Sequence, residues 1–97
     1  MGGKRVEFES SAREDVRAAV AWYEERSEKA ALEFIEELGR AVALIEDAPA
    51  RWALGKDNMR RFPLWRFPFA VVYEEEDSRI AVWAVAHGSR RPNYWVR

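Results

Sequence analysis

The first 26 residues show two kinds of hydrophobic periodicity. Residues 5–9 alternate polar and apolar side chains, which predicts a short strand with one buried face. The next segment repeats apolar residues three and four positions apart, which predicts an amphipathic helix. Ser11 and Glu14 have the spacing of a capping box at its start. The apolar face of this helix consists of Val16, Ala19, Val20 and Tyr23.

A second helical stripe follows a polar turn at residues 24–29, in which Ser27 is the expected N-cap. Pro49 ends this stripe, because proline cannot continue a helix. Two amphipathic helices joined by so short a turn are predicted to form an antiparallel hairpin. The apolar positions of the second helix are Ala31, Phe34, Ile35, Leu38, Val42 and Ile45.

The period changes after residue 50, where short β-like segments replace the helical stripes. Residues 59–62 and 69–74 predict two strands, and the polar residues 75–78 predict a hairpin turn after them. Pro63 and Pro68 restrict the part between these strands to a sheet edge or a turn.

Residues 79–87 are apolar on both alternating faces, which predicts a strand in the middle of the sheet. Strict alternation places Ile80, Val82, Ala84 and Ala86 on one face and Ala81, Trp83 and Val85 on the other. The predicted fold class is therefore α+β, with an N-terminal strand and an antiparallel helical hairpin packed on a three- to four-stranded antiparallel sheet. At 97 residues, the chain is expected to form a single domain over residues 1–97.

The composition excludes several classes of site. The chain has no cysteine and one histidine, so it has no disulfide framework, thiolate zinc site or cysteine nucleophile. We expect neither a metal nor a cofactor. No apolar run is long enough to span a membrane, and the N-terminus lacks the apolar stretch of a signal peptide. These features predict a cytoplasmic protein without a membrane partner.

The net charge of −1 hides an asymmetry between the two halves of the chain. Residues 1–50 carry 7 basic and 12 acidic side chains, whereas residues 51–97 carry 9 basic and 5 acidic ones. The C-terminal half is therefore the candidate surface for an anion or an acidic partner. A net charge near zero argues against general polyanion binding, and we expect no direct specific binding of DNA by this chain alone.

His87 ends the predicted central strand, where the sheet opens to solvent. Because histidine titrates near neutral pH, it is a candidate general acid or base. The alternative is a structural histidine that packs on Trp83 or Val85 and hydrogen-bonds to the backbone.

Arginine, tyrosine and tryptophan gather near the ends of the predicted sheet. Arg60 and Arg61 point to opposite faces of one strand, and Tyr94 and Trp95 are expected to fold back and hold their neighbouring arginines near His87. Such a set can cleave RNA without metal, with a base on the 2′-hydroxyl, an acid on the leaving oxygen and cations on the phosphate. It equally suits a protein-binding surface, where Arg, Trp and Tyr are typical anchors. The candidate phosphate- or target-contacting residues are Arg60, Arg61, Arg66, Arg90 and Arg91.

Three stretches of the chain resemble the RelE/ParE superfamily of bacterial type II toxins, and the order of predicted elements extends this resemblance over nearly the whole chain. They are Arg60-Arg61-Phe62-Pro63, Phe67-Pro68-Phe69-Ala70-Val71-Val72-Tyr73, and Ala84-Val85-Ala86-His87 with Arg90-Arg91-Pro92-Asn93-Tyr94-Trp95. The resemblance implies a growth-inhibiting toxin, of the kind linked to plasmid stabilisation, whose cognate antitoxin wraps it with a C-terminal segment. RelE-like members are ribosome-dependent mRNA endonucleases, whereas ParE-like members inhibit DNA gyrase.

Two departures from the ribonuclease branch favour the ParE side. That branch typically carries an arginine at the position of Ala70, and its members are usually strongly basic, whereas this sequence has a pI near 5.9. We therefore predict a toxin that binds and poisons gyrase and is not an enzyme. The alternative is a metal-independent ribonuclease that acts on mRNA at the ribosome, with His87, Tyr94 and Arg91 as catalytic residues. A degenerate toxin, retained to bind its antitoxin, is the third interpretation.

Overall fold

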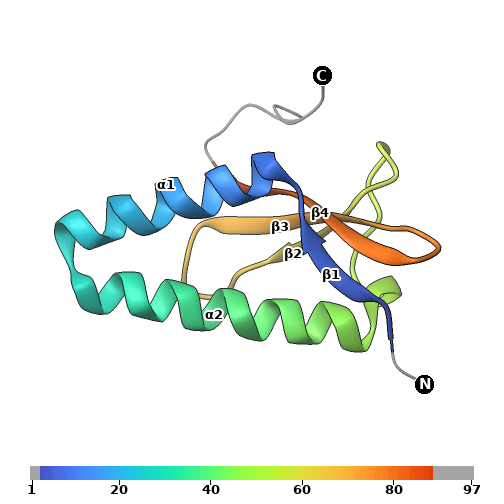
Figure 1. Cartoon of the computed structure of the whole chain (residues 1–97), viewed down its shortest axis with the longest axis horizontal. Coiled ribbons are helices and arrows are strands. Elements are labelled where there is room, and N and C mark those ends of the chain that lie inside the picture. Colours follow the sequence, from blue (N-terminus) through green and yellow to red (C-terminus); the bar gives the residue numbers. More distant parts are fainter. Residues whose placement is uncertain (1–2, 89–97) are drawn as a thin grey trace.

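The computed structural model describes residues 3–88, and its elements follow the predicted order (Figure 1). Along the chain, a helical hairpin follows one N-terminal strand and precedes three further strands. The elements are β1 (Arg5–Phe8), α1 (Ser10–Arg26), α2 (Glu28–Asp47), a 3-10 turn η1 (Pro49–Arg51), β2 (Arg60–Pro63), β3 (Phe69–Glu75) and β4 (Arg79–His87).

The four strands form one sheet in the order β1-β4-β3-β2. The pairs β2–β3 and β3–β4 are antiparallel, as predicted, and β4 is a central strand. β1 differs from the prediction, because it pairs with β4 in parallel. A parallel pair requires a long connection, and the helical hairpin that follows β1 is part of that connection. The sheet is therefore mixed.

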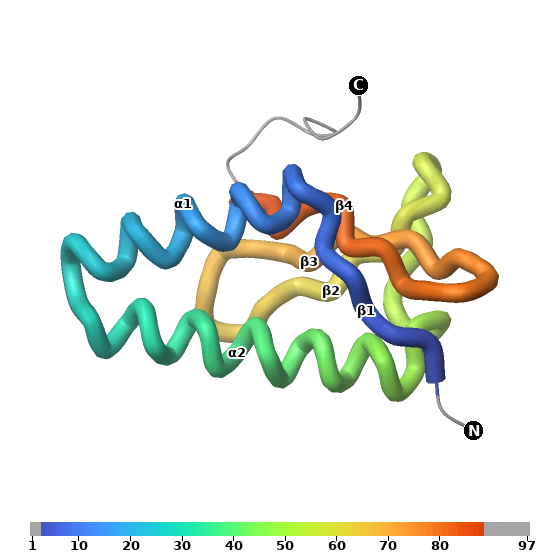
Figure 2. Tube along the Cα trace, viewed as in Figure 1, coloured from blue at the N-terminus to red at the C-terminus, as the bar shows by residue number. Residues whose placement is uncertain are grey.

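Both helices cover the same face of the sheet and run side by side, with β2 and β3 beyond them (Figures 1 and 2). The core lies between these two layers. Its largest fully buried side chains include Phe34 and Ile45 from α2, Tyr73 from β3 and Ile80 from β4. Tyr73 also donates a hydrogen bond from its hydroxyl to the Pro49 carbonyl (2.6 Å), which fixes the turn after α2.

A register shift in the β3–β4 pair changes which residues of β4 face the helices. Val72 pairs with Ala84 but Tyr73 pairs with Val82, so Trp83 is the extra residue of a β-bulge. The alternation expected for residues 79–87 is therefore wrong beyond Val82. Val85 joins Ile80 and Val82 in the main core, while Ala84 and Ala86 join Trp83, Val72 and Met59 in a second cluster.

The start of α1 continues the hydrogen bonding of β4 where β1 ends. The Glu9 amide donates to the Val82 carbonyl (2.9 Å), Ser11 Oγ donates to the Trp83 carbonyl (2.7 Å), and the Val85 amide donates to Asp15 Oδ2 (3.0 Å). The predicted capping box is thus wrong, because Ser11 bonds the neighbouring strand and the N-cap is Glu9, without a side-chain cap bond.

The second helix begins as predicted, with Ser27 as its N-cap and its Oγ accepting the Ala30 amide (3.1 Å). Within residues 3–88, neither helix combines the length and apolar character that crossing a membrane requires.

Candidate partner-binding surfaces

A pocket of about 310 Å³ opens between α1 and the adjoining ends of β3 and β4. Its walls are mostly apolar and aromatic, and they include the side chains of Asp15 and His87. We call it the His87 pocket. It is lined by Asp15, Ala18, Ala19, Trp22, Tyr23, Pro68, Phe69, Val85 and His87.

His87 lies at the C-terminal end of β4 and faces this pocket. Its ring packs edge-on against Phe69, its partner on β3, with the centroids 5.0 Å apart and the planes at 90°. The expected contact with Trp83 is absent among these ring contacts, because the bulge turns that residue toward the other face of the sheet. Val85 lines the same pocket as His87.

The two arginines of β2 lie on opposite faces, as predicted, and each is held by nearby groups. Arg60 is paired with the buried Tyr73 and donates to the Trp52 carbonyl (2.7 Å). Arg61 binds both carboxylate oxygens of Asp57, at 2.9 and 3.2 Å. The hydrogen bond from Arg61 holds the pKa of Asp57 below its usual range, since it favours the charged carboxylate.

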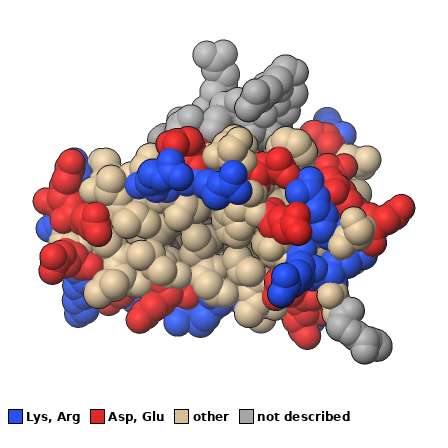
Figure 3. Space-filling view, in the orientation of Figure 1, with Lys and Arg blue, Asp and Glu red and all other residues tan. Residues whose placement is uncertain are grey.

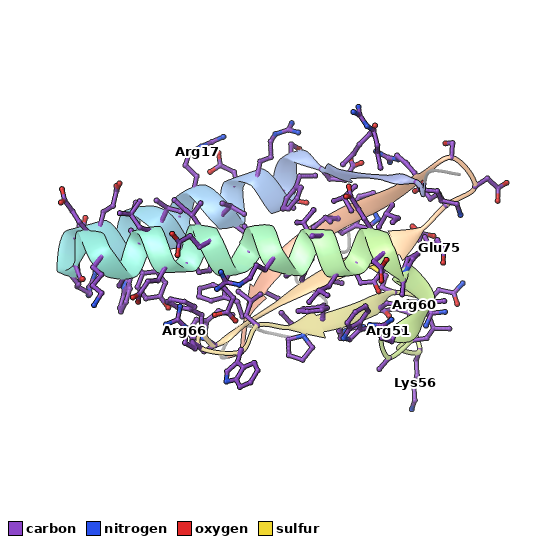
Figure 4. All side chains as sticks on the ribbon, turned by 90° about the horizontal axis from the view of Figure 1, so that it is seen from below. Arg17, Arg51, Lys56, Arg60, Arg66 and Glu75 are labelled. Atoms are coloured by element: carbon purple, nitrogen blue, oxygen red, sulfur yellow. The ribbon has the colours of Figure 1, made fainter. Side chains whose placement is uncertain are left out.

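The structure does not bring Arg60 and Arg61 to His87. Arg60 pairs with Tyr73 of β3, whereas His87 pairs with Phe69, which precedes Tyr73 by four residues on the same strand. Four residues correspond to about 13 Å along a strand, and β2 and β4 are additionally about 10 Å apart across β3. Arg66 is distant from Arg60 as well, because it pairs with Glu33 and Glu37 in the first half of α2, whereas Arg60 lies near the C-terminal end of that helix (Figure 4).

A second apolar groove, of about 450 Å³, runs between α2 and the β2–β3 connection. Trp65 is its most prominent side chain and is 91% exposed. We call this the Trp65 groove. It is lined by Glu37, Arg40, Ala41, Leu44, Phe62, Pro63, Trp65 and Arg66.

Glu37 of α2 holds the loop that carries Trp65. Its side chain is buried, and its carboxylate accepts the backbone amides of both Trp65 and Arg66. The Arg66 guanidinium lies 3.5 Å from the same carboxylate and 3.9 Å from that of Glu33. A buried carboxylate is satisfied here by two amides and one cation, so the loop is tied to the helix.

Neither Glu37 nor Trp65 is among the residues that the sequence patterns single out. One signal was present, because Glu37 adjoins Leu38 inside the apolar stripe of the second helix, where a charged residue is expected only if it is paired. The other was a tryptophan placed in a loop between Pro63 and Pro68.

Three of the predicted site residues, Arg90, Arg91 and Tyr94, lie outside the described residues, as does Trp95. Their roles stay predictions, as do those proposed for His87, Arg60, Arg61 and Arg66. Over residues 3–88, no group of three or more histidine, aspartate or glutamate side chains is arranged to hold a metal ion.

Comparison with known proteins identifies the family. A family model for the ParE toxin of the parDE type II toxin–antitoxin system matches residues 6–92. The chain belongs to the ParE toxin family. This ParE-family chain is also similar to a solved chain of the chromosomal ParDE toxin–antitoxin system from P. aeruginosa. The TM-score is 0.78 at 15% identity, over 87% of this chain and 95% of that one, so this likeness concerns the fold.

No curated protein matches the sequence of this ParE-family chain. The predicted membership of the RelE/ParE superfamily, nearer ParE, is confirmed by the family match. Its α+β fold is confirmed by the structural match, with the parallel β1–β4 pair as the one difference from the antiparallel sheet expected.

Proposed function

We propose that this ParE-family chain is the toxin of a toxin–antitoxin pair and that it stops growth by binding and poisoning DNA gyrase. The observation that carries the proposal is the family match over residues 6–92. Ala70 supports it, because the RelE-like ribonuclease branch typically has an arginine there. Ala70 lies between Pro63 and Ala86, its partners on the neighbouring strands, and none of these three described residues carries a positive charge. Since gyrase acts on chromosomal DNA, the proposed place of action is the cytoplasm.

The proposed neutralising partner is a cognate antitoxin, and the Trp65 groove is its proposed docking surface. On the helical side of the molecule, uncharged surface lies between bands of charged side chains (Figure 3). The Trp65 groove adds an apolar channel beside α2, bordered by Arg40 and Arg66. We therefore infer that the antitoxin offers an amphipathic segment with apolar residues for the groove and acidic residues for its rim.

The edges of the sheet favour a helix in the groove over an added strand. On β2, the Arg61 amide already donates to the Ala53 carbonyl (3.1 Å), and Pro63 has no amide hydrogen. On β1, the Val6 amide donates to the Glu46 carboxylate (3.1 Å). An added strand needs amide donors along an edge, and the donors at these three positions are occupied or missing. Deleting the C-terminal half of the antitoxin should abolish the complex, and an unchanged affinity would refute this docking.

A supercoiling assay tests the proposed target. Purified toxin is expected to inhibit gyrase, and the antitoxin is expected to restore activity when added in equimolar amount. Supercoiling that persists at large molar excess of toxin would reject the gyrase proposal. Parallel labelling of cells with thymidine and methionine separates the alternatives: DNA synthesis should fail first. Earlier failure of protein synthesis would instead favour ribosome-dependent mRNA cleavage, and unaffected growth would favour a degenerate toxin.

A further inference from the structure

The second helix has apolar residues on the side that faces away from the core. They recur three and four positions apart, so they share one face of α2 over about three turns. Leu32 is 62% exposed and Ile35 is 47% exposed. An exposed apolar surface of this kind is typical of a partner-binding face. We call it the outer stripe, and it consists of Leu32, Ile35, Gly39, Val42 and Ala43.

Gly39 lies at the middle of the outer stripe and is open to solvent. Apart from its own helical turn, no atom of the described chain lies within 4 Å of the position that a Cβ would occupy there. Glycine is unfavourable inside a helix, but it lets a neighbouring helix approach the backbone closely. The stripe therefore has a shallow centre between the larger side chains of Ile35 and Val42.

The charged residues beside the outer stripe complement a second copy of α2. Lys29 and Asp47 lie near opposite ends of the helix, and Glu36 and Arg40 lie near its middle. At 3.6 residues per turn, all four lie within about 40° of one another around the helix axis. Asp47 lies 4.0 Å from Arg51 of the following turn and keeps a side chain that is 74% exposed.

An antiparallel pair of α2 helices brings these charges together. In such a pair, residues face each other when their numbers add up to the same value. Lys29 and Asp47 add up to 76, and so do Glu36 and Arg40. One twofold axis at Leu38 therefore places Lys29 opposite Asp47 and Glu36 opposite Arg40, each twice.

The same register also packs the apolar residues of the two stripes. It brings Leu32 near Ala43 of the second copy and Ile35 near Val42, with Gly39 close to the axis. Large side chains then meet smaller ones, which is how the ridges of one helix fit the grooves of another. The apolar and the charged residues thus favour one and the same arrangement.

The size of the hairpin's outer face fits a small dimer interface. Its shorter helix, α1, has 17 residues and is therefore about 25 Å long, and two helices side by side are about 20 Å wide. A second copy on this face would bury about 500 Å² per chain, or about 1,000 Å² in all, which is the lower limit for a specific interface. On α1, Arg17 points away from the sheet (Figure 4), and Glu14 balances its charge within the same chain. We therefore expect a weak dimer that dissociates on dilution.

We propose that the outer stripe is the interface of a twofold dimer of this chain, in which two α2 helices pack antiparallel about an axis at Leu38. The Trp65 groove contains none of the five stripe residues, so the dimer leaves its apolar walls open. Arg40 borders that groove as well, and the charge test below therefore uses Lys29 and Asp47. The dimer concerns the toxin alone and does not depend on its target.

Sedimentation of the purified toxin over a roughly hundredfold range of concentration should show a monomer–dimer equilibrium. Gly39→Arg has open space in the monomer but places bulk and two like charges at the axis, so we expect association to weaken by more than about tenfold. Ala18→Arg, at an exposed position of α1 in the His87 pocket, is the matched control and should change association by less than about twofold. A toxin that is monomeric at every concentration, or equal losses in the two variants, would overturn the proposal.

A charge exchange tests the register independently. Lys29→Glu and Asp47→Lys each place like charges opposite each other, so each variant alone should associate about tenfold more weakly. Mixed in equal amounts, the two variants should form a heterodimer as stable as the parent dimer, because each new charge then faces its opposite. Both changes suit the helix dipole, so the fold should remain intact. A mixture that associates no better than the single variants would refute this register.

The antitoxin is the other possible occupant of the outer stripe. In the dimer proposed here, Gly39→Arg should leave the affinity of the monomeric toxin for its antitoxin unchanged. A parent toxin that stays monomeric while Gly39→Arg weakens antitoxin binding would overturn the dimer and assign the stripe to the antitoxin. Failure to inhibit gyrase would reject the proposed target and leave the dimer unaffected.

Discussion

In both the His87 pocket and the Trp65 groove, a carboxylate on a helix binds the backbone of another element, but the two elements differ. Each lies between one helix and the sheet, and in each a helical carboxylate accepts backbone amides. Asp15 of α1 accepts the Val85 amide of a central strand, whereas Glu37 of α2 accepts the amides of Trp65 and Arg66 in a loop. The bond from the Val85 amide to Asp15 continues the hydrogen bonding of β4 past the point where β1 ends. The bonds to Glu37 position a loop whose tryptophan is exposed.

The two surfaces are therefore stabilised differently. The core supports the His87 pocket, whereas a single side chain supports the Trp65 groove. The walls of the His87 pocket belong to α1, β3 and β4, which the sheet and core hold by many contacts. The Trp65 groove depends on the loop between β2 and β3, and Glu37 is the residue that ties this loop to α2. We therefore expect substitutions to damage the groove more easily than the pocket.

The largest expected effect is that of Glu37→Ala. It leaves the amides of Trp65 and Arg66 without their acceptor, and we expect the free energy of unfolding to fall by about 3 kcal/mol. Urea denaturation measures this loss. Glu36→Ala, at the exposed neighbouring position, is the matched control and should change stability by less than about 0.5 kcal/mol. Equal losses in the two variants would show that Glu37 does not hold the loop.

Trp65→Ala should weaken antitoxin binding while the fold stays intact. The indole is 91% exposed, so its removal costs little in stability, but a central aromatic anchor contributes about 2 kcal/mol, or roughly 30-fold in affinity. Calorimetry with the cognate antitoxin measures the change. Trp22→Ala, in the His87 pocket, is the control with the same side chain removed and should bind as the parent does. A larger effect of Trp22→Ala would indicate that the antitoxin binds at the His87 pocket and not in the Trp65 groove.

The sequence was sufficient for the elements and insufficient for the two surfaces, for physical reasons. Periodicity reports which side chains face a core, so the helices and strands were predicted within a residue or two, except at the end of the first helix. There α1 continues through Arg26, into the segment predicted as a polar turn at residues 24–29. It assumes regular alternation, and the bulge at Trp83 broke that rule, which reversed the faces of Ala84 and Val85 and removed the expected contact to His87. A β-bulge is defined by how two strands pair, and the sequence of one strand alone does not show this pairing.

The functional residues show the same limit. Ser11 was interpreted through its neighbour Glu14, but its partner is Trp83, 72 positions away. Glu37 was overlooked because its partners lie 28 and 29 positions away, in a loop. Local capping patterns compete with such long-range bonds, and the tertiary contact decided the outcome here. Arg60 and Arg61 were expected with His87 near the ends of the sheet, but the strand register places them far from it.

Asp15→Ala tests whether the carboxylate in the His87 pocket acts as that of Glu37 does in the groove. It removes the acceptor of one amide, that of Val85, where Glu37→Ala removes the acceptor of two. We expect a loss of about 1 kcal/mol, seen as roughly fivefold faster hydrogen exchange of the Val85 amide. Glu14→Ala is the control, because Glu14 is exposed and pairs with Arg17 on the helix surface. If the Val85 amide stays equally protected without Asp15, another group satisfies it and the parallel between the two carboxylates fails.

The smallest expected effect concerns Asp57, which lines neither surface and so provides a reference for both. The bond from Arg61 lowers the pKa of Asp57 in the folded protein, so folding is favoured by this pair above the ordinary aspartate pKa of 3.8. Because both side chains are partly exposed, at 21% and 36%, the gain over Asp57→Asn at pH 7 should be about 0.5 kcal/mol. It should shrink as the pH falls below about 4 and vanish below the folded pKa. Urea denaturation of both proteins between pH 7 and pH 2 measures it, with Asp77→Asn as the exposed control. A stability difference that stays constant across this range would mean that the Asp57–Arg61 pair contributes no charge-dependent stabilisation.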